Sequence, residues 1–197
     1  MHLLLGLGNP GREYAGTRHN VGFEVVDTLA ERLGWAPVGE FDRLARTRFE
    51  SLAFEGAIET SRGSEKVLLM KPLTYMNVSG RAVKQAMGFY KVAVADVLVV
   101  VDELALPAGK LRLRGEGSPG GHNGLRDLQR AFGTAEYARL RIGIDPPPPP
   151  VAGKDYVLGK FSEEQRIEID KALLKAAACC VVWADQGVTR AMNEFNG

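Results

Sequence analysis

Residues 97–101 read Val-Leu-Val-Val-Val, and this run constrains the fold more than any other segment of the chain. An unbroken run of β-branched residues and leucine is typical of a strand with both faces covered, because a half-exposed strand alternates apolar and polar side chains. Asp102 follows the run directly. In open α/β sheets, ligands gather outside the carboxyl ends of the strands. The sequence therefore predicts a central buried strand with Asp102 at a ligand-binding edge.

The other segments with strand or helix character alternate irregularly along the 197 residues, with a cluster of hairpin-like strands in the middle. Their order predicts one α/β domain over residues 1–197, in which a twisted mixed β-sheet carries helices on both faces. Further strands are predicted at 3–7, 47–54, 56–60, 66–70, 110–114 and 138–144, and helices at 21–33, 80–90 and 125–132, then from Ser162 to Gly187 and on to Phe195.

Several predicted helices begin at capping residues. Ser162 and Gln165 have the spacing of a capping box, in which each side chain accepts a hydrogen bond from the backbone N–H of the other residue. Asn20 is predicted to cap the helix that follows it. Either Ser79 or Asn77 is predicted to cap the helix at 80–90.

Charge and composition limit the classes of function. The net charge is only +1, yet residues 110–145 carry seven Lys or Arg against four Asp or Glu, a local excess that predicts a phosphate-facing surface. Cys179 and Cys180 are adjacent, which indicates buried packing in a reducing cytoplasm and not a disulfide. No apolar stretch reaches the length of a signal peptide or membrane span, so we expect a cytoplasmic protein.

Two of the three histidines are followed by asparagine in glycine-flanked sequence, as His19-Asn20 and His122-Asn123. Histidine exchanges a proton near neutral pH, and asparagine donates and accepts hydrogen bonds without ionising. A carboxylate on one imidazole nitrogen fixes the tautomer and leaves the other nitrogen as an acceptor. We therefore expect His19 to act as a base with Asp102 as its partner. The alternative for a lone histidine is a structural role.

Residues 6–11, Gly-Leu-Gly-Asn-Pro-Gly, have the spacing of a dinucleotide-binding fingerprint. That motif must open directly into a helix, because the helix N-terminus binds the pyrophosphate. Here Pro10, Gly11 and Gly16 delay the predicted helix to residue 21. We therefore expect no dinucleotide, and a tight turn that presents Asn9. The alternative is that Asn9 only caps its own turn.

Residues 115–124 contain five glycines between a predicted strand and a predicted helix, and the loop ends in the second His-Asn pair. Such a loop opens its backbone amides to an oxygen-rich ligand. Segment 71–77 also joins a strand to a helix, with Asn77 placed to face a substrate or to cap. The sequence has no serine elbow, no cysteine nucleophile setting and no metal-ligand spacing, so a metal site is not expected.

Taken in order, eight segments resemble the bacterial-type peptidyl-tRNA hydrolase family over nearly the whole chain. The resemblance implies a single cytoplasmic domain that cleaves the ester between a peptide and the 3′-terminal ribose of tRNA, without cofactor or metal. It implies peptidyl-tRNA as partner, bound by its acceptor stem and 3′ end, with no membrane, no obligate protein partner and a monomeric state. The segments are 6–11 with Tyr14, then 17–23, 71–80, 102–109, 120–125, 139–144, 155–161 and Ser162.

By position, the resemblance also implies roles for single residues. His19 is similar to the general base that activates water, Asp102 to its partner, and Asn9 to the residue that contacts the peptide. The remaining matches are Asn77 and Asn123 as groups that hold substrate and water, Tyr14 and Tyr75 as tRNA-side contacts, Arg114 and Arg141 as a clamp on a tRNA phosphate, and His122 as a supporting residue.

The chain departs from the family pattern at Ala105, where a further aspartate is common. We expect this change to affect loop packing or surface charge. The proline run 146–150 is also unusual and is expected to form a stiff surface loop. The main alternative function is a non-catalytic RNA-binding relative. The presence of all the polar residues named for the pocket favours the enzyme.

Overall fold

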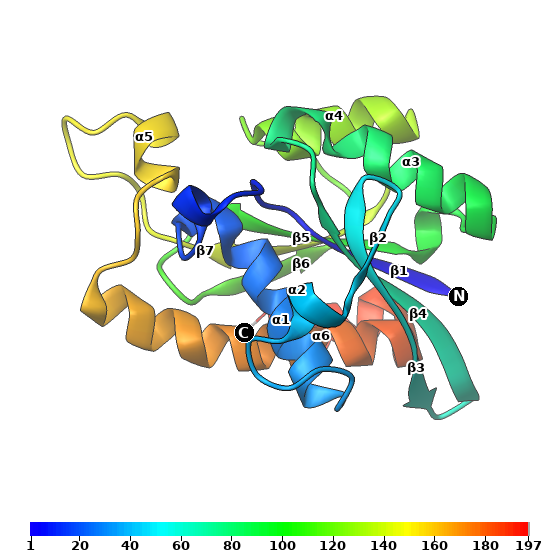
Figure 1. The fold of residues 1–197 in the computed structure, drawn as a ribbon. Coiled ribbons are helices and arrows are strands. Elements are labelled where there is room, and N and C mark those ends of the chain that lie inside the picture. The colour runs from blue at the N-terminus through cyan, green and yellow to red at the C-terminus, as the bar shows by residue number, and fades with distance from the viewer. Residues whose placement is uncertain (197) are drawn as a thin grey trace.

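The chain folds around a seven-stranded mixed sheet, and the computed structural model describes residues 1–196. The strand order is β2-β3-β4-β1-β5-β7-β6 (Figure 1). β4, β1, β5 and β7 run parallel, whereas β2 with β3, β3 with β4, and β6 with β7 are antiparallel pairs. The strands are β1 His2–Gly6, β2 Arg46–Arg48, β3 Ser51–Thr60, β4 Gly63–Pro72, β5 Val97–Glu103, β6 Leu111–Arg114 and β7 Ala138–Gly143.

Helices cover both faces of the sheet, as predicted (Figure 1). Leu98 and Val100 of β5 pack in the core under α1 and α6, while Val99 and Val101 pack in the core under α3 and α4. Successive side chains of a strand point to opposite faces, so the apolar run fills both cores. The helices are α1 Val21–Arg32, α2 Phe41–Leu44, α3 Ser79–Tyr90, α4 Asn123–Phe132, α5 Gly153–Val157 and α6 Glu163–Phe195, with 3₁₀ turns η1 Arg12–Tyr14, η2 Arg18–Asn20, η3 Met76–Val78 and η4 Val94–Asp96.

The C-terminal helix begins and breaks where the sequence predicts. The Ser162 hydroxyl accepts from the Gln165 backbone N–H, and the Gln165 side chain accepts from the Ser162 N–H, which completes the capping box. At Gly187 the backbone leaves the helical region, with φ 81° and ψ 177°. Glycine adopts a positive φ without the steric penalty of a Cβ. Cys179 and Cys180 are buried free thiols inside this helix.

The predicted break between the strands at 47–54 and 56–60 is wrong, because β3 runs without interruption through Glu55 and Gly56. A Cβ at Gly56 would lie 2.3 Å from Cζ2 of Trp35, so this glycine admits an indole ring and does not form a turn. The turn falls instead at Phe49 and Glu50, whose φ angles are 53° and 51°.

The predicted caps of α3 are also wrong. The N-cap position is Val78, no side chain caps it locally, and Asn77 is exposed. The N–H of Gly80 donates instead to Asp127 Oδ2 at 2.7 Å. A side chain of α4 therefore satisfies a backbone donor that a local cap would otherwise take.

Two short helices, α2 and α5, were not predicted. The loop before α5 contains the proline run 146–150, which is largely exposed, as expected of a surface loop. Figure 1 shows this loop and α5 beyond the end of the sheet toward which β1 runs. None of the helices in residues 1–196 combines the length and apolar character that a membrane crossing needs.

Candidate active site

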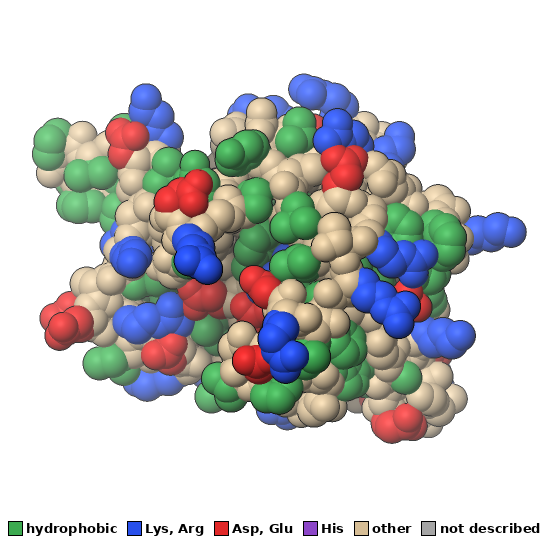
Figure 2. Space-filling view, in the orientation of Figure 1, with side chains coloured by type: hydrophobic (Ala, Val, Ile, Leu, Met, Phe, Trp, Pro, Cys, Tyr) green, Lys and Arg blue, Asp and Glu red, His purple; other side chains and the backbone are tan. Residues whose placement is uncertain are grey.

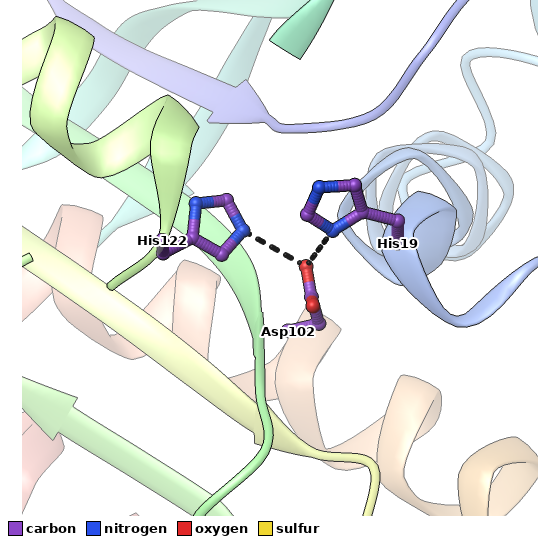
Figure 3. Close-up of side chains that lie close together, drawn as sticks. All are labelled: His19, Asp102 and His122. Carbon is purple, nitrogen blue, oxygen red and sulfur yellow. Dashed lines mark hydrogen bonds and ion pairs between the residues drawn. The ribbon is translucent and has the colours of Figure 1, made fainter. Parts of the chain in front are cut away.

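One buried carboxylate lies between two imidazoles (Figure 3). Asp102 Oδ1, at the carboxyl end of β5, lies 2.8 Å from His19 Nδ1 and 3.0 Å from His122 Nε2. The side chains of His19, His122 and Asp102 are 12%, 10% and 2% exposed. The structure thus brings together the pair predicted from the sequence and adds the second histidine to it.

The two imidazoles use their nitrogens differently. An ionised carboxylate only accepts hydrogen bonds, so His19 Nδ1 and His122 Nε2 are both donors to Asp102. The Nδ1 of His122 also accepts from the backbone N–H of Leu125, at 3.3 Å. Both nitrogens of His122 are therefore engaged. His19 keeps Nε2 as a lone-pair acceptor with no partner in the described part of the chain, which is the state a general base requires.

The pKa of Asp102 reflects a balance between burial and hydrogen bonding. Burial by itself would raise this pKa, but the N–H groups of His122 and His19, both directed at Oδ1, hold it well below its ordinary value of 3.8. Asp102 therefore stays ionised at neutral pH. An ionised Asp102 can stabilise an imidazolium that forms on its neighbour.

The turn that carries His19 is fixed by contacts far along the chain. The guanidinium of Arg18 lies 3.9 Å above the ring of Tyr156 in α5, and it donates to Gln165 Oε1 at 2.8 Å. On the other side, a Cβ at Gly22 would lie 2.5 Å from the carbonyl oxygen of Val100. Glycine at this position lets the start of α1 approach β5, which brings His19 to Asp102.

Asn9 and Asn20 form a bridge beside this turn. Asn20 Oδ1 accepts from the backbone N–H of Asn9 at 2.9 Å, and Asn20 Nδ2 donates to the Asn9 carbonyl, also at 2.9 Å. Asn20 does occupy the N-cap position of α1, as predicted, but its side chain makes this tertiary bridge and no capping hydrogen bond. Asn9 Oδ1 in turn accepts from the N–H of Met76 at 3.0 Å. Its NH₂ group has no partner within residues 1–196, and remains a donor for a ligand.

Two hollows adjoin these residues. We call the first, of about 220 Å³, the histidine hollow; His19 and Asp102 lie in its wall, and the second, of about 370 Å³, is the asparagine hollow beside Asn9. The histidine hollow is walled by His19, Asp102, Glu103, Leu104, Gly120, Gly121, His122, Asn123, Gly153, Lys154 and Val157. The end of β5, the glycine loop and α5 thus meet His19 around a partly apolar space.

The asparagine hollow contains a buried cation. Lys71, 6% exposed in its side chain, lies 2.5 Å from Asp27 Oδ1 and 2.7 Å from Asp42 Oδ1. Burial nevertheless raises the pKa of Asp27 to about 6, against the attraction of Lys71. From the sequence, Lys71 is recognised only as part of a segment that joins a strand to a helix, and its burial between two carboxylates is not predicted.

The other predicted binding residues are placed less centrally. Asn123 lines the histidine hollow, and its Oδ1 accepts from Arg126 at 3.1 Å, which leaves its NH₂ group as a donor. Asn77 and Tyr75 are exposed on the segment before α3, and Tyr14 is half-buried in η1. None of these last three belongs to the described wall of either hollow.

The two predicted phosphate-binding arginines differ in their surroundings. Arg114 is exposed on the edge strand β6. Arg141 is 14% exposed in its side chain, pairs with Glu103, and donates to the carbonyl of Ser118 at 2.7 Å. Its charge is thus partly compensated within the protein. On the face drawn in Figure 2, further Lys and Arg side chains stand over α3 and α4 and beside β2.

The ligand atoms of His19, Asp102 and His122 lie within 4.8 Å of one another, close enough to hold a metal ion. Their hydrogen bonds do not fit that use. Metal binding at His122 Nε2 needs a lone pair there, but Nδ1 already accepts from Leu125, so Nε2 carries the proton. A metal at Nε2 would require the other tautomer of His122, in which a protonated Nδ1 would face the backbone N–H of Leu125.

Two positioning residues of the site, Arg18 and Asn20, escaped the sequence prediction. The only signal was that both flank His19. Their partners lie elsewhere: Arg18 donates to the carbonyl of Tyr156, 138 residues away, and Asn20 bonds to Asn9, 11 residues away. Such pairings depend on the fold and leave no local pattern.

Comparisons with known proteins agree with one another along the whole chain. A family profile described as peptidyl-tRNA hydrolase matches residues 3–197. The peptidyl-tRNA hydrolase of Geobacillus kaustophilus is 46% identical over 197 residues, and that of Bacillus cytotoxicus 43% identical over 196; each alignment covers 100% of both chains. A crystal structure of peptidyl-tRNA hydrolase from Acinetobacter baumannii superposes with a TM-score of 0.88 at 36% identity, covering 100% of this chain and 95% of that one.

Proposed function

This chain belongs to the peptidyl-tRNA hydrolase family and hydrolyses the ester bond of peptidyl-tRNA, and we propose that His19 activates the water that attacks this ester. The observation that carries the proposal is the pairing of His19 Nδ1 with the buried carboxylate of Asp102 at 2.8 Å. This bond leaves Nε2 of His19 as an acceptor, and His19 lines the histidine hollow. A general base needs such an unprotonated nitrogen within hydrogen-bond reach of the attacking water.

In the proposed reaction, His19 Nε2 takes a proton from water as the water oxygen bonds to the ester carbonyl carbon. The resulting tetrahedral intermediate collapses when the bond from that carbon to the ribose oxygen breaks. The imidazolium of His19 returns the proton to the leaving ribose oxygen, which yields free tRNA and a peptide carboxylic acid. Asp102 stabilises the imidazolium between the two proton transfers. No covalent enzyme intermediate is required.

Asparagine amides are assigned to the reacting carbonyl. Asn9 and Asn123 each have the side-chain oxygen engaged within the protein, so each presents an NH₂ donor. Such donors bind the carbonyl oxygen and the negative charge that develops on it, without offering a competing nucleophile. Asn9 is assigned to the peptide side. Asn77, which is exposed near α3, is assigned to the approaching substrate.

The tRNA side of the proposal rests on two aromatic and two basic residues, of which Tyr75 and Arg114 are exposed. Tyr14 and Tyr75 are assigned to the 3′ end, and Arg114 and Arg141 to a phosphate of the acceptor stem. Phosphate contacts of this kind weaken with added salt because counterions compete for them. Because Arg141 already pairs with Glu103, Arg114 is expected to carry more of the salt dependence. His122 is assigned a supporting role through Asp102.

The setting of the enzyme completes the proposal. We place residues 1–197 in one domain that acts in the cytoplasm as a monomer, with no obligate protein partner and no membrane association. The reaction as written needs neither a cofactor nor a metal, because an ester is already activated toward water.

The test is hydrolysis of an N-acetylated aminoacyl-tRNA by the purified chain with a chelator present, beside the unblocked aminoacyl-tRNA. We expect rapid cleavage of the blocked substrate alone. Loss of activity in chelator, restored by a divalent ion under conditions in which the tRNA stays folded, would contradict the metal-free mechanism. Binding of tRNA without cleavage of either substrate would favour the alternative, a non-catalytic RNA-binding relative.

A further inference from the structure

Arg139 is a fully buried cation at the second position of β7. In the described residues 1–196, the acceptors that its guanidinium meets are all backbone carbonyl oxygens. It donates to Gly117, to Ala135 at 2.6 Å, and to Tyr137 at 3.1 and 3.2 Å. A buried charge without an anionic partner is costly, so its retention calls for a specific use.

These carbonyls bracket the element that carries His122. Gly117 lies in the glycine loop before α4, and Ala135 lies just after the end of α4. A single guanidinium therefore ties together the two chain segments that flank this helix. The neighbouring Arg141 adds a second hold on the loop, at the carbonyl of Ser118.

A second route connects Arg139 to the first turn of α4. Its guanidinium carbon lies 3.8 Å from the centre of the Tyr137 ring, and the Tyr137 hydroxyl donates to the Leu125 carbonyl at 3.3 Å. The N–H of Leu125 donates to His122 Nδ1, and His122 Nε2 donates to Asp102. An unbroken series of contacts thus leads from Arg139 to the carboxylate that orients His19.

We propose that Arg139 is a positioning residue for the hydrolysis: it holds the glycine loop and the start of α4 so that His122 keeps the tautomer that donates to Asp102. The proposal rests on the proposed function only for its effect on rate. Its structural content, the tautomer of His122, is a property of the protein without substrate.

Arginine suits this role because its planar guanidinium offers five donors in a fixed geometry, and it stays charged when buried. Burial does lower the pKa of Arg139. A lysine at this position would keep the positive charge but would have only one nitrogen to share among three carbonyl acceptors. Arg139→Lys therefore tests the geometry of the group, with charge held constant.

The experiment compares wild type, Arg139→Lys and a matched control, Arg62→Lys. Arg62 also donates to a backbone carbonyl, that of Asp185, at 2.7 Å, on an exposed turn. For Arg139→Lys we expect kcat on N-acetylated aminoacyl-tRNA to fall about three- to fivefold with KM nearly unchanged, because the change reaches the reaction only through the hydrogen bond of His122 to Asp102. The control should match wild type in both constants.

Histidine ¹⁵N shifts of the substrate-free proteins report the His122 tautomer independently of activity. We expect a proton on Nε2 in wild type and a mixture of tautomers in Arg139→Lys. A folded Arg139→Lys protein with unchanged kcat and an unchanged His122 tautomer would overturn the proposal, as would a loss confined to KM. If Arg139→Lys does not fold, Tyr137→Phe, which removes only the hydroxyl bond to Leu125, provides the same two readouts. If wild type does not cleave the ester but Arg139→Lys still changes the His122 tautomer, the proposed function fails and the structural part of the proposal, control of that tautomer by Arg139, stands.

Discussion

The histidine hollow contains a buried carboxylate, Asp102, and the asparagine hollow a partly buried one, Asp27, and the pKa values of these two carboxylates move in opposite directions. The pKa of Asp102 is held well below its ordinary value by two imidazole donors that act against burial. The pKa of Asp27 is raised to about 6, although Lys71 lies only 2.5 Å away. A nearby cation is therefore not sufficient to keep a partly buried carboxylate acidic.

The two pKa values differ because Asp102 has two hydrogen-bond donors to itself, whereas Asp27 shares its one cation with a second carboxylate. Both imidazoles direct an N–H group at one oxygen of Asp102. Lys71 divides its charge between Asp27 and Asp42, and the like charges of Asp42 and Glu31 raise the pKa of Asp27 further. Hydrogen bonds to the charged form outweigh desolvation in the first hollow and do not in the second. The first hollow is thus suited to holding a charge during a reaction, and the second to taking up a proton.

The largest effect is expected from His19→Asn. Asparagine keeps a donor for Asp102 but cannot accept a proton from water. We expect kcat on blocked aminoacyl-tRNA to fall by about 10²–10⁴. Affinity for tRNA, measured by filter binding with a non-hydrolysable analogue, should change little. A loss of tRNA binding that accounts for the whole loss of activity would contradict the role of His19 as base.

Asp102→Asn comes next, because it removes the charge that both imidazoles share. We expect kcat to fall by roughly 10², since the imidazolium of His19 loses its stabilising partner. The same variant tests the pKa shift. A carboxylate whose folded pKa is lowered stabilises the fold above its ordinary value of 3.8, and this contribution is lost as pH falls through the lower folded pKa.

The stability test compares urea unfolding of wild type and Asp102→Asn at pH 5 and pH 3. The advantage of wild type over the variant should shrink at the lower pH. An advantage that stays constant or grows between these pH values would show that the pKa of Asp102 is not lowered in the folded state.

A smaller effect is expected from His122→Asn. This change preserves a hydrogen-bond donor near Asp102, and His19 keeps its own bond to the carboxylate. The loss of one well-placed hydrogen bond is worth about 1 kcal/mol, so kcat should fall by roughly five- to tenfold. A steady-state comparison with His19→Asn under identical conditions is the measurement. Equal losses of kcat in the two variants would contradict the assignment of His19 as the base and of His122 as a supporting residue.

The smallest effect is expected from Asp27→Asn, and it concerns stability. Because the folded pKa of Asp27 is raised to about 6, its stabilising contribution is present in acid and is lost as pH rises through 6. Wild type should therefore gain in Tm over the variant, by about 2–4 °C, when pH falls from 7 to 5. The measurement is the Tm of both proteins at pH 7 and at pH 5. A Tm difference between wild type and variant that is the same at both pH values would contradict the raised pKa of Asp27.

Much of the fold was predictable because its signals are local. The run at 97–101 predicts a strand covered on both faces, and β5 lies between β1 and β7 under two helical layers. The capping box at Ser162 and the break at Gly187 are likewise confirmed. The errors arise where a distant side chain replaces a local signal. The ring of Trp35 packs against Gly56 inside β3, and Asp127 accepts the hydrogen bond of Gly80 in place of the predicted cap of α3.

The sequence by itself determined the alternation of strands and helices, the placing of Asp102 at a sheet edge, and the glycine loops that carry two His-Asn pairs, because periodicity, turn chemistry and spacing are properties of neighbouring residues. Only the tertiary structure decided which nitrogen of each histidine faces Asp102, that Asn20 bridges to Asn9, and that Arg139 holds both flanks of α4. These contacts join residues far apart in the chain. Their hydrogen bonds depend on how distant elements pack together, and no single segment of the sequence predicts that packing.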